Sequence, residues 1–244
     1  MTPGVFNPYA SRLSVPTARL FMRRIAALTV LIGLPCVPAA AQENTRFFAG
    51  GLFGISALSA DAQSVTTGSD AALSLYDPKL GPALNLFAGV HVAQYFSIQA
   101  NWMWNRNDIT LVSSFATPTG GGHYEQVRHS DQHAIVLDGL IYFRGLKSAI
   151  RPYLGTGVSV LRFSGSDVIR SAANGLEPPA GGIVSTRIGL RSHVGIDASL
   201  SRHVSFRYSF SETISGNPIG SVLTPPGRRG LMNFQNLFGF VARF

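Results

Sequence analysis

The chain has 244 residues, of which 45% are hydrophobic and only 13% are charged, and its formal net charge is +8. Soluble domains carry about 25% charged residues, and a membrane-spanning helix needs about 18 consecutive apolar residues, which the body of the chain lacks. The composition therefore disfavours an ordinary soluble domain and a helical membrane protein. It leaves a soluble all-β domain or a membrane-spanning β-barrel.

The first 41 residues have the organisation of a secretory signal peptide. A basic start from Met22 to Arg24 precedes the apolar segment 25–33 and the small residues Ala39 to Ala41. We expect residues 1–41 to be an N-terminal extension and a cleaved signal peptide, with translation starting at Met22. Residues 42–244 are then expected to form one domain, without the single cysteine and so without a disulfide.

Cleavage of the signal peptide would also lower the net charge of the chain. The first 41 residues contain Arg12, Arg19, Arg23 and Arg24 but no acidic residue, so the net charge of the remainder falls from +8 to +4. The mature chain also lacks a basic patch interleaved with aromatic residues, which nucleic-acid recognition uses. We therefore expect no nucleic-acid partner.

The mature chain is predicted to contain eight strands, because apolar and polar residues alternate with a period of two. The alternation is clearest where Val204, Phe206, Tyr208 and Phe210 face one side and Arg207 and three serines face the other. The predicted strands are 46–57, 82–92, 96–105, 132–143, 151–162, 183–199, 204–212 and 234–244.

Long and short connections alternate between these strands. The long polar connections are predicted at 59–80, 106–130, 163–182 and 213–230. Such alternation is typical of an up-and-down barrel in a membrane. Lipid offers no hydrogen bonds, so the last strand must pair with the first. The sequence thus predicts an all-β fold, an eight-stranded antiparallel up-and-down transmembrane β-barrel, with both termini on the short-turn side.

The strand faces predict which side chains point into the barrel. An eight-stranded barrel has an interior that side chains fill, so we expect a filled lumen in which arginines pair with acidic residues. The predicted lumen network is Asp138, Arg187, Arg191, His193, Asp197, Arg207 and Arg243, with Gln99 and Asn101 beside them. Glycines of the same faces, such as Gly155 and Gly195, would make room for these side chains. Aromatic residues near the strand ends predict an interfacial girdle of Trp102, Trp104, Tyr153 and Tyr208.

Three segments resemble the small OmpA-like and OmpX-like outer-membrane barrels. Gly195 to Phe210 is similar to their penultimate hairpin, Arg151 to Val158 to their fifth strand, and Asn236 to Phe244 to their closing strand. The resemblance implies the outer membrane of a Gram-negative cell, with both termini in the periplasm. It implies biogenesis by periplasmic chaperones and the barrel-assembly machinery, with Phe240 and Phe244 in the assembly signal. The expected surroundings are outer-membrane lipids, including lipopolysaccharide, and the barrel is expected to be a monomer.

Some barrels of this kind modify lipid A, and two groups of residues in the chain are candidates for such a catalytic site. His203, Ser205 and Glu212 have the composition of a deacylase site, but Glu212 lies on the opposite strand face and roughly 23 Å from His203. A serine nucleophile needs its base within about 3 Å. The consecutive residues 129–131, His-Ser-Asp, cannot all face one another on an extended chain. We therefore expect no catalytic site.

A possible metal site lies in the second long connection. His123, Glu125, His129, Asp131 and His133 share one parity. On an extended strand the imidazoles would lie about 13 and 20 Å apart, too far to share one ion. We expect a solvated loop there, no metal and no cofactor.

The expected function is structural, with surface interactions through four external loops and no enzymatic activity. In the last loop, Arg228 and Arg229 are candidates to meet lipopolysaccharide phosphates. Three alternatives stay open: a lipid A-modifying barrel enzyme such as a deacylase, a narrow porin-like channel, and a soluble lipocalin-like carrier.

Overall fold

The computed structural model of the protein describes residues 47–60, 64–66, 71–117, 119–165, 167–223 and 230–244. The expected signal peptide and start at Met22, and also Arg228 and Arg229, lie outside these residues. Strands dominate the described part of the chain, and the one 3-10 helix given there is η2 (Gly220–Val222). No helix among the described residues is long and apolar enough to cross a membrane.

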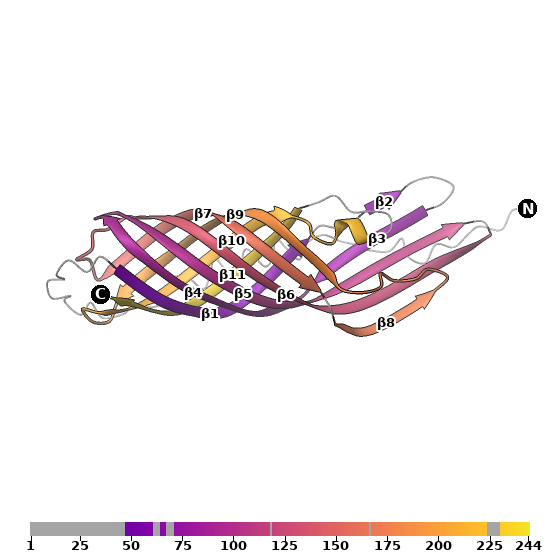
Figure 1. Ribbon diagram of the computed structural model, residues 1–244, viewed down its shortest axis with the longest axis horizontal. Helices are drawn as coiled ribbons and strands as arrows, with labels where there is room; N and C mark the ends of the chain where they lie inside the picture. The colour runs from indigo at the N-terminus through magenta and orange to yellow at the C-terminus, as the bar shows by residue number, and fades with distance from the viewer. Residues whose placement is uncertain (1–46, 61–63, 67–70, 118, 166, 224–229) are drawn as a thin grey trace, which may run out of the picture. The chain divides into compact units, whose positions relative to one another are not determined.

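Eight antiparallel strands form a closed ring (Figure 1). In ring order they are β1 (Phe47–Ala60), β4 (Leu80–Ala93), β5 (Phe96–Thr117), β6 (Gly120–Tyr142), β7 (Ile150–Gly165), β9 (Ile183–Ser199), β10 (Val204–Gly216) and β11 (Gly230–Arg243). Strand β1 pairs with β4 on one side and with β11 on the other, so that Phe48 lies between Gly89 and Arg243. The predicted eight-stranded antiparallel barrel is confirmed.

The outer wall of the ring is apolar. Outward-facing side chains along the strands remain exposed, among them Ile188 at 74%, Leu137 at 61% and Phe240 at 56%. Phe206 and Phe210 are half-buried because their rings pack against Phe240 and Phe234 of the neighbouring strand, at 6.1 and 6.3 Å between centroids. No other layer of the described residues covers this wall, as expected where lipid is the outer solvent.

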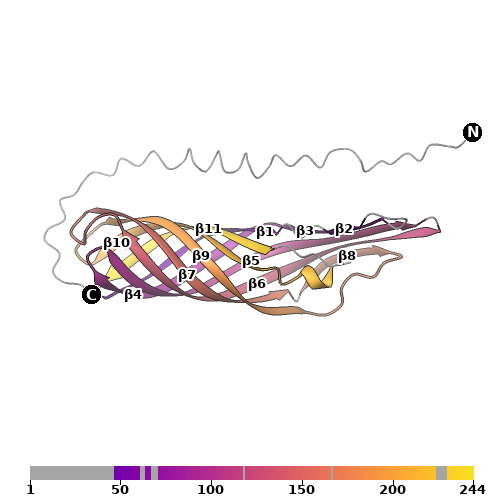
Figure 2. The same ribbon diagram turned by 90° about the horizontal axis from the view of Figure 1, so that it is seen from above.

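Short turns and long connections lie at opposite ends of the ring. The turns 94–95, 143–149 and 200–203 lie at the same end as the C-terminus, which we call the short-turn end. The other connections contain three additional strands, β2 (Ser64–Thr66), β3 (Ala71–Pro78) and β8 (Val168–Asn174). Both views place these strands at the far end, which we call the long-connection end (Figure 1, Figure 2).

The prediction of a polar loop over residues 106–130 is wrong. Strands β5 and β6 continue through most of this segment as one hairpin, paired from Phe96–Ile141 to Thr117–Gly120. Strand β4 stops pairing with β5 at Asn105 and β7 stops pairing with β6 at Asp131. Beyond these points β3 and β8 pair with the two edges of the hairpin. The strands therefore continue past the barrel because new partners satisfy their backbone groups.

This extension forms a five-stranded sheet, which we call the outer sheet: β2, β3, residues 106–117 of β5, residues 120–131 of β6, and β8. One side chain secures the sheet to the connection that follows β8. Arg128 is fully buried, and its guanidinium donates to the carbonyl of Gly181 at 2.6 Å, to the carbonyl of Pro179 and to Gln126 Oε1 at 2.6 Å. Burial lowers the pKa of Arg128, and these acceptors offset part of that cost.

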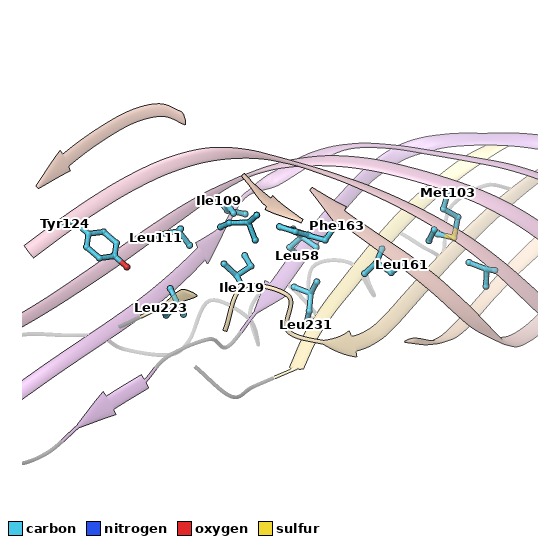
Figure 3. Close-up of a cluster of buried hydrophobic side chains, with 13 residues drawn as sticks. Leu58, Met103, Ile109, Leu111, Tyr124, Leu161, Phe163, Ile219, Leu223 and Leu231 are labelled. Carbon is cyan, nitrogen blue, oxygen red and sulfur yellow. The ribbon is translucent and has the colours of Figure 1, made fainter. Parts of the chain in front are cut away.

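The lumen at the long-connection end is filled by apolar side chains (Figure 3). Ile219 and Leu223, on either side of η2, are buried and belong to one cluster with Ile109, Leu111 and Tyr124 of the hairpin. The cluster also includes Leu58, Met103, Leu161, Phe163 and Leu231. The last long connection thus closes this end of the barrel with an apolar contact, whereas the sequence predicted a polar interior throughout.

Because lipid contacts the outer wall, a charged side chain placed there should lower the stability of the folded barrel. Leu137→Arg places a guanidinium near the middle of the apolar belt, where it should destabilise the barrel by about 2–4 kcal/mol. His133→Arg, four residues along the same face and near the polar rim, is the control and should cost at most about 1 kcal/mol. Denaturant unfolding in lipid vesicles, followed by tryptophan fluorescence, measures both. Equal costs for the two variants would contradict a lipid-facing wall.

Candidate functional site: the charged network inside the barrel

Arg207 is the centre of the polar interior. Strand β10 places it directly opposite Asp197 of β9, and both side chains are buried. Its Nε donates to Asp197 Oδ1 at 2.5 Å and its Nη2 to Asp197 Oδ2 at 2.7 Å. Nη1 donates to Gln99 Oε1 at 2.8 Å, and Nη2 donates to the Tyr142 hydroxyl at 2.9 Å. One guanidinium therefore connects β10 with β9, β5 and β6 across the lumen.

Asp138 is a second acidic centre in the same interior. It accepts a hydrogen bond from Arg191 Nη1 at 2.6 Å and another from Asn101 Nδ2 at 2.9 Å. His193 Nε2 lies 3.4 Å from the same carboxylate. Asn101 Oδ1 accepts from Gln99 Nε2 at 2.6 Å, and Gln99 in turn accepts from Arg207. These contacts link both acidic centres into one arrangement, which we call the charged network.

Aromatic rings surround the arginines of the network. The Arg207 guanidinium carbon lies 4.9 Å from the centre of the Phe87 ring and 5.0 Å from that of Tyr153. The Arg151 guanidinium carbon lies only 3.8 Å from the centre of the Tyr142 ring. Cation–π attraction offsets part of the cost of moving these charges out of water.

Two glycines make space for this packing, as predicted. A Cβ atom on Gly155 would collide with the imidazole of His193 on β9. A Cβ atom on Gly195 would collide with the hydroxyl of Tyr153 and with the backbone of β10. The absence of a side chain at these positions therefore allows the large polar groups to fit inside an eight-stranded ring.

The structure buries six of the seven predicted lumen residues: Asp138, Arg191, His193, Asp197, Arg207 and Arg243. The prediction for Arg187 is wrong, because that side chain is exposed. Arg187 has the inward parity, but β10 stops pairing with β9 at Gly189, so the wall that would enclose the side chain is missing there.

Three of the four residues of the predicted aromatic girdle face the outer wall. Trp102 is 37% exposed on the outer wall, and Trp104 and Tyr208 are half-buried there. The prediction for Tyr153 is wrong, because its ring is 2% exposed and faces the lumen. Its parity matches Gly155 and Gly157, whose missing side chains already marked the inward face of that strand.

Arg151 and Tyr142 are lumen residues that the sequence analysis does not predict. Both side chains are buried inside the barrel, Arg151 at 1% and Tyr142 at 2% exposure. The same parity argument identifies Arg151, since it shares its face with Tyr153, Gly155 and Gly157. Alternation along the strand therefore predicts which side chains face the lumen better than proximity to the strand end does.

Neither catalytic candidate is assembled. Ser205 is buried in the lumen, where Arg243 donates to its hydroxyl, whereas His203 is exposed in a turn and Glu212 lies on the outward face. Ser130 is buried and donates to the backbone carbonyl of Asn107 at 2.9 Å, while the residues on either side of it point outward.

The residues of the metal candidate lie on a strand rather than a loop, and each has a different neighbour. His129 Nδ1 is 2.5 Å from Asp108 Oδ1, Arg106 Nε is 3.2 Å from Asp131 Oδ1, and Arg170 Nη2 is 3.3 Å from Glu125 Oε1. His123 Nδ1 lies 2.7 Å from Ser114 Oγ, and the His133 ring stacks on Trp102. Among the described residues, no three His, Cys, Asp or Glu side chains are grouped to hold a metal ion.

A closed antiparallel ring with an apolar outer wall and a buried charged network defines a β-barrel of the kind found in outer membranes. Residues 26–244 match the family model described as outer membrane protein beta-barrel domain. The chain belongs to this family, which places it in the outer membrane.

Several solved barrels are similar to the chain in fold. OprG from Pseudomonas aeruginosa shares 16% identity, over 82% of this chain and 96% of that one, with a TM-score of 0.49. Neisserial surface protein A shares 14%, over 81% and 97%, with a TM-score of 0.48. Ail from Yersinia pestis shares 10%, over 82% and 99%, with a TM-score of 0.39. A search of curated proteins found no match.

The charged network predicts that Arg207 is a dominant contributor to stability. Arg207→Met leaves Asp197 buried without its partner and should destabilise the folded barrel by about 3–5 kcal/mol. Adding Asp197→Leu removes the orphaned charge and should recover most of the loss. Arg170→Met, which breaks an exposed ion pair, is the control and should cost less than about 1 kcal/mol. Denaturant midpoints measure all three, and a double variant no more stable than Arg207→Met would contradict the pairing argument.

Proposed function

We propose that the protein is a non-enzymatic outer-membrane barrel with a closed lumen, which holds the outer sheet at the cell surface for interaction with external partners. The observation that carries this proposal is the combination of a filled interior with a hairpin that continues well beyond the barrel. Strands β5 and β6 have 22 and 23 residues, whereas β4 and β11 have 14 each.

The closed lumen is supported by what fills it at each level. The charged network occupies the short-turn end and the apolar cluster around Ile219 and Leu223 occupies the other. Between them, the amide of Asn233 donates to Asn105 Oδ1 at 3.1 Å and to Gln132 Oε1 at 3.4 Å. A cavity beside these residues has a volume of about 10 Å³, enough for about one water molecule. Such an interior favours a scaffold over a channel.

The outer sheet is suited to recognition because it is held rigidly and presents polar groups. Its outward face carries the cross-strand pairs Arg106–Asp131, Asp108–His129 and Glu125–Arg170. Strand β8 is exposed along all seven residues, including Val168 at 47% and Ile169 at 49%, and it forms one edge of the sheet. An exposed strand edge next to charged pairs offers both backbone and side-chain groups to a partner.

We further propose that outer-leaflet lipid contacts the barrel at a polar rim. Arg162 is exposed on the outer wall between His133 and Thr186, one step above the apolar residue Val160. No ion pair of Arg162 is found among the described residues, so its charge is available to a lipopolysaccharide phosphate. Below it, a shallow apolar hollow of about 420 Å³ lies on the wall beside Ala49, Ala88 and Ala100, where acyl chains would pack.

We infer an orientation and a route of assembly from the same geometry. The short-turn end would face the periplasm and the outer sheet would face the exterior. Phe240 on the last strand and Phe244 directly after it are 56% and 68% exposed, so they are accessible to an assembly machinery that reads the closing strand. A single closed ring needs no second copy to complete it, which favours a monomer.

The closed lumen predicts that the barrel conducts no ions across a bilayer. Purified wild-type barrel inserted into planar lipid bilayers should give no discrete current steps, because no continuous water path crosses the filled interior. A deletion of 217–229 that joins β10 to β11 by a short turn removes the apolar closure and serves as the comparison. Reproducible single-channel steps from the wild-type barrel would instead favour a narrow channel.

The proposed orientation predicts that the long-connection end is accessible from outside the cell and the short-turn end is not. An epitope inserted at 118–119 should be labelled on intact cells, whereas one inserted at 145–148 should be labelled only after the outer membrane is permeabilised.

Replacing residues 108–128 by a two-residue turn should leave a barrel that still resists SDS before boiling. The same trimmed protein in nanodiscs should lose binding that the full-length protein shows on an array of glycosaminoglycans and matrix proteins. Equal binding by both proteins would contradict a role for the outer sheet.

A further inference from the structure

The short-turn end of the lumen contains more buried positive than negative charge. Of the described residues buried there, Arg151, Arg207 and Arg243 are cations, at 1%, 1% and 3% exposure, and Asp197 is the acidic residue among them. Asp138 lies deeper in the barrel, where Arg191 binds it. The two acidic centres thus bind one arginine each, and two further arginines remain.

Asp197 does not neutralise these two arginines. Both of its oxygens accept from Arg207. Arg151 lies opposite Asp197 in the register of β7 and β9, but its guanidinium stacks on Tyr142 instead. Its one hydrogen bond in the described structure is a long one, from Nε to the Arg144 carbonyl at 3.5 Å, and Nη1 and Nη2 are buried without a partner.

Arg243 is in a similar position at the end of β11. Its Nη2 donates to the hydroxyls of Ser199, at 3.1 Å, and Ser205. These acceptors are neutral, and Nη1 is buried without a partner among the described residues. Arg243 donates to Ser199, which lies two residues from Asp197 on β9, and Asp197 is the register partner of Arg151, so β9 places the two arginines at the same level of the lumen.

A buried guanidinium without a counter-charge is costly, because hydroxyl and carbonyl dipoles replace only part of its hydration. Three donor nitrogens at this end remain to be satisfied, and they belong to two cations that repel each other. A small anion between them would accept hydrogen bonds from both and remove the repulsion. Buried rings of Phe48 and Tyr142 line the same end of the lumen.

We propose that Arg151 and Arg243 bind a small inorganic anion of the size and charge of chloride at the short-turn end of the lumen. The bound anion completes the charged network and couples β7 to β11, which no hydrogen bond of the described side chains does directly. The site stabilises the folded barrel, since an anion that binds only the folded state shifts the unfolding equilibrium.

Bromide provides a direct test on the wild-type protein. Crystals of the barrel soaked in bromide should show an anomalous peak within hydrogen-bonding distance of the guanidinium groups of both Arg151 and Arg243. Absence of a peak at this position, in crystals that bind bromide elsewhere or not at all, would overturn the proposal. This test requires no variant and so does not depend on whether a variant folds.

Stability in solution provides the second test. Chloride is titrated against gluconate at constant ionic strength, and the folded fraction of detergent-solubilised barrel in denaturant is read from unboiled gels. Above saturation, each tenfold rise in free chloride should multiply the folded-to-unfolded ratio of the wild type by about ten. Arg151→Met combined with Arg243→Met should abolish this dependence, whereas the surface control Arg170→Met should retain it. An equal chloride response in the double variant and the wild type would indicate a general salt effect and overturn the proposal.

Discussion

The bidentate contact between Arg207 and Asp197 is the interaction on which the interior of this barrel depends. The register of β9 and β10 places the two residues opposite each other, and the remaining donors of the same guanidinium reach Gln99 and Tyr142 on the far wall. Ring closure removes the sheet edges that lipid cannot satisfy, but it also encloses the inward side chains. Those side chains must then satisfy one another, and Arg207 binds groups from three other strands at once.

The contents of the lumen support the proposal of a scaffold over that of a channel. Charged, amide and apolar side chains follow one another along the barrel, and each group is held by contacts across the lumen. The apolar cluster also links the barrel to the outer sheet, because Ile109, Leu111 and Tyr124 belong to the hairpin while Leu58 and Leu231 belong to the wall. A packed interior therefore extends from the barrel into the outer sheet.

The alternation of residues between the two faces of a strand is the most reliable signal in the sequence. It fails to predict burial where burial also depends on a neighbouring strand. Alternation in 204–212 identified the inward position of Arg207, and alternation in 183–199 identified Arg191, His193 and Asp197. It failed at Arg187, because exposure there depends on where the neighbouring strand ends, which is a property of two strands and not of one. At Tyr153 the alternation indicates the inward face, whereas an aromatic ring near a strand end predicts a girdle position.

The hairpin beyond the barrel was missed for a related reason. A bilayer accounts for strands of about ten residues, so polar residues past that length predict a loop. The strands continue because β3 and β8 pair with them, and those strands lie in connections whose sequences alternate too briefly to be recognised alone. Likewise, the burial of Ile219 and Leu223 depends on a fold-back of the last connection that no local pattern encodes.

The pairing of β1 with β11 has a consequence for biogenesis. These two strands come from opposite ends of the described chain, so their contact has the largest sequence separation in the ring. Contacts of this kind form late, because the entropy of closing so long a loop must be overcome first. Until residues 230–243 dock, β1 exposes an unsatisfied edge that membrane lipid cannot tolerate, and a prematurely terminated chain would keep that edge. Closure of the ring thus requires the last residues of the barrel to be present.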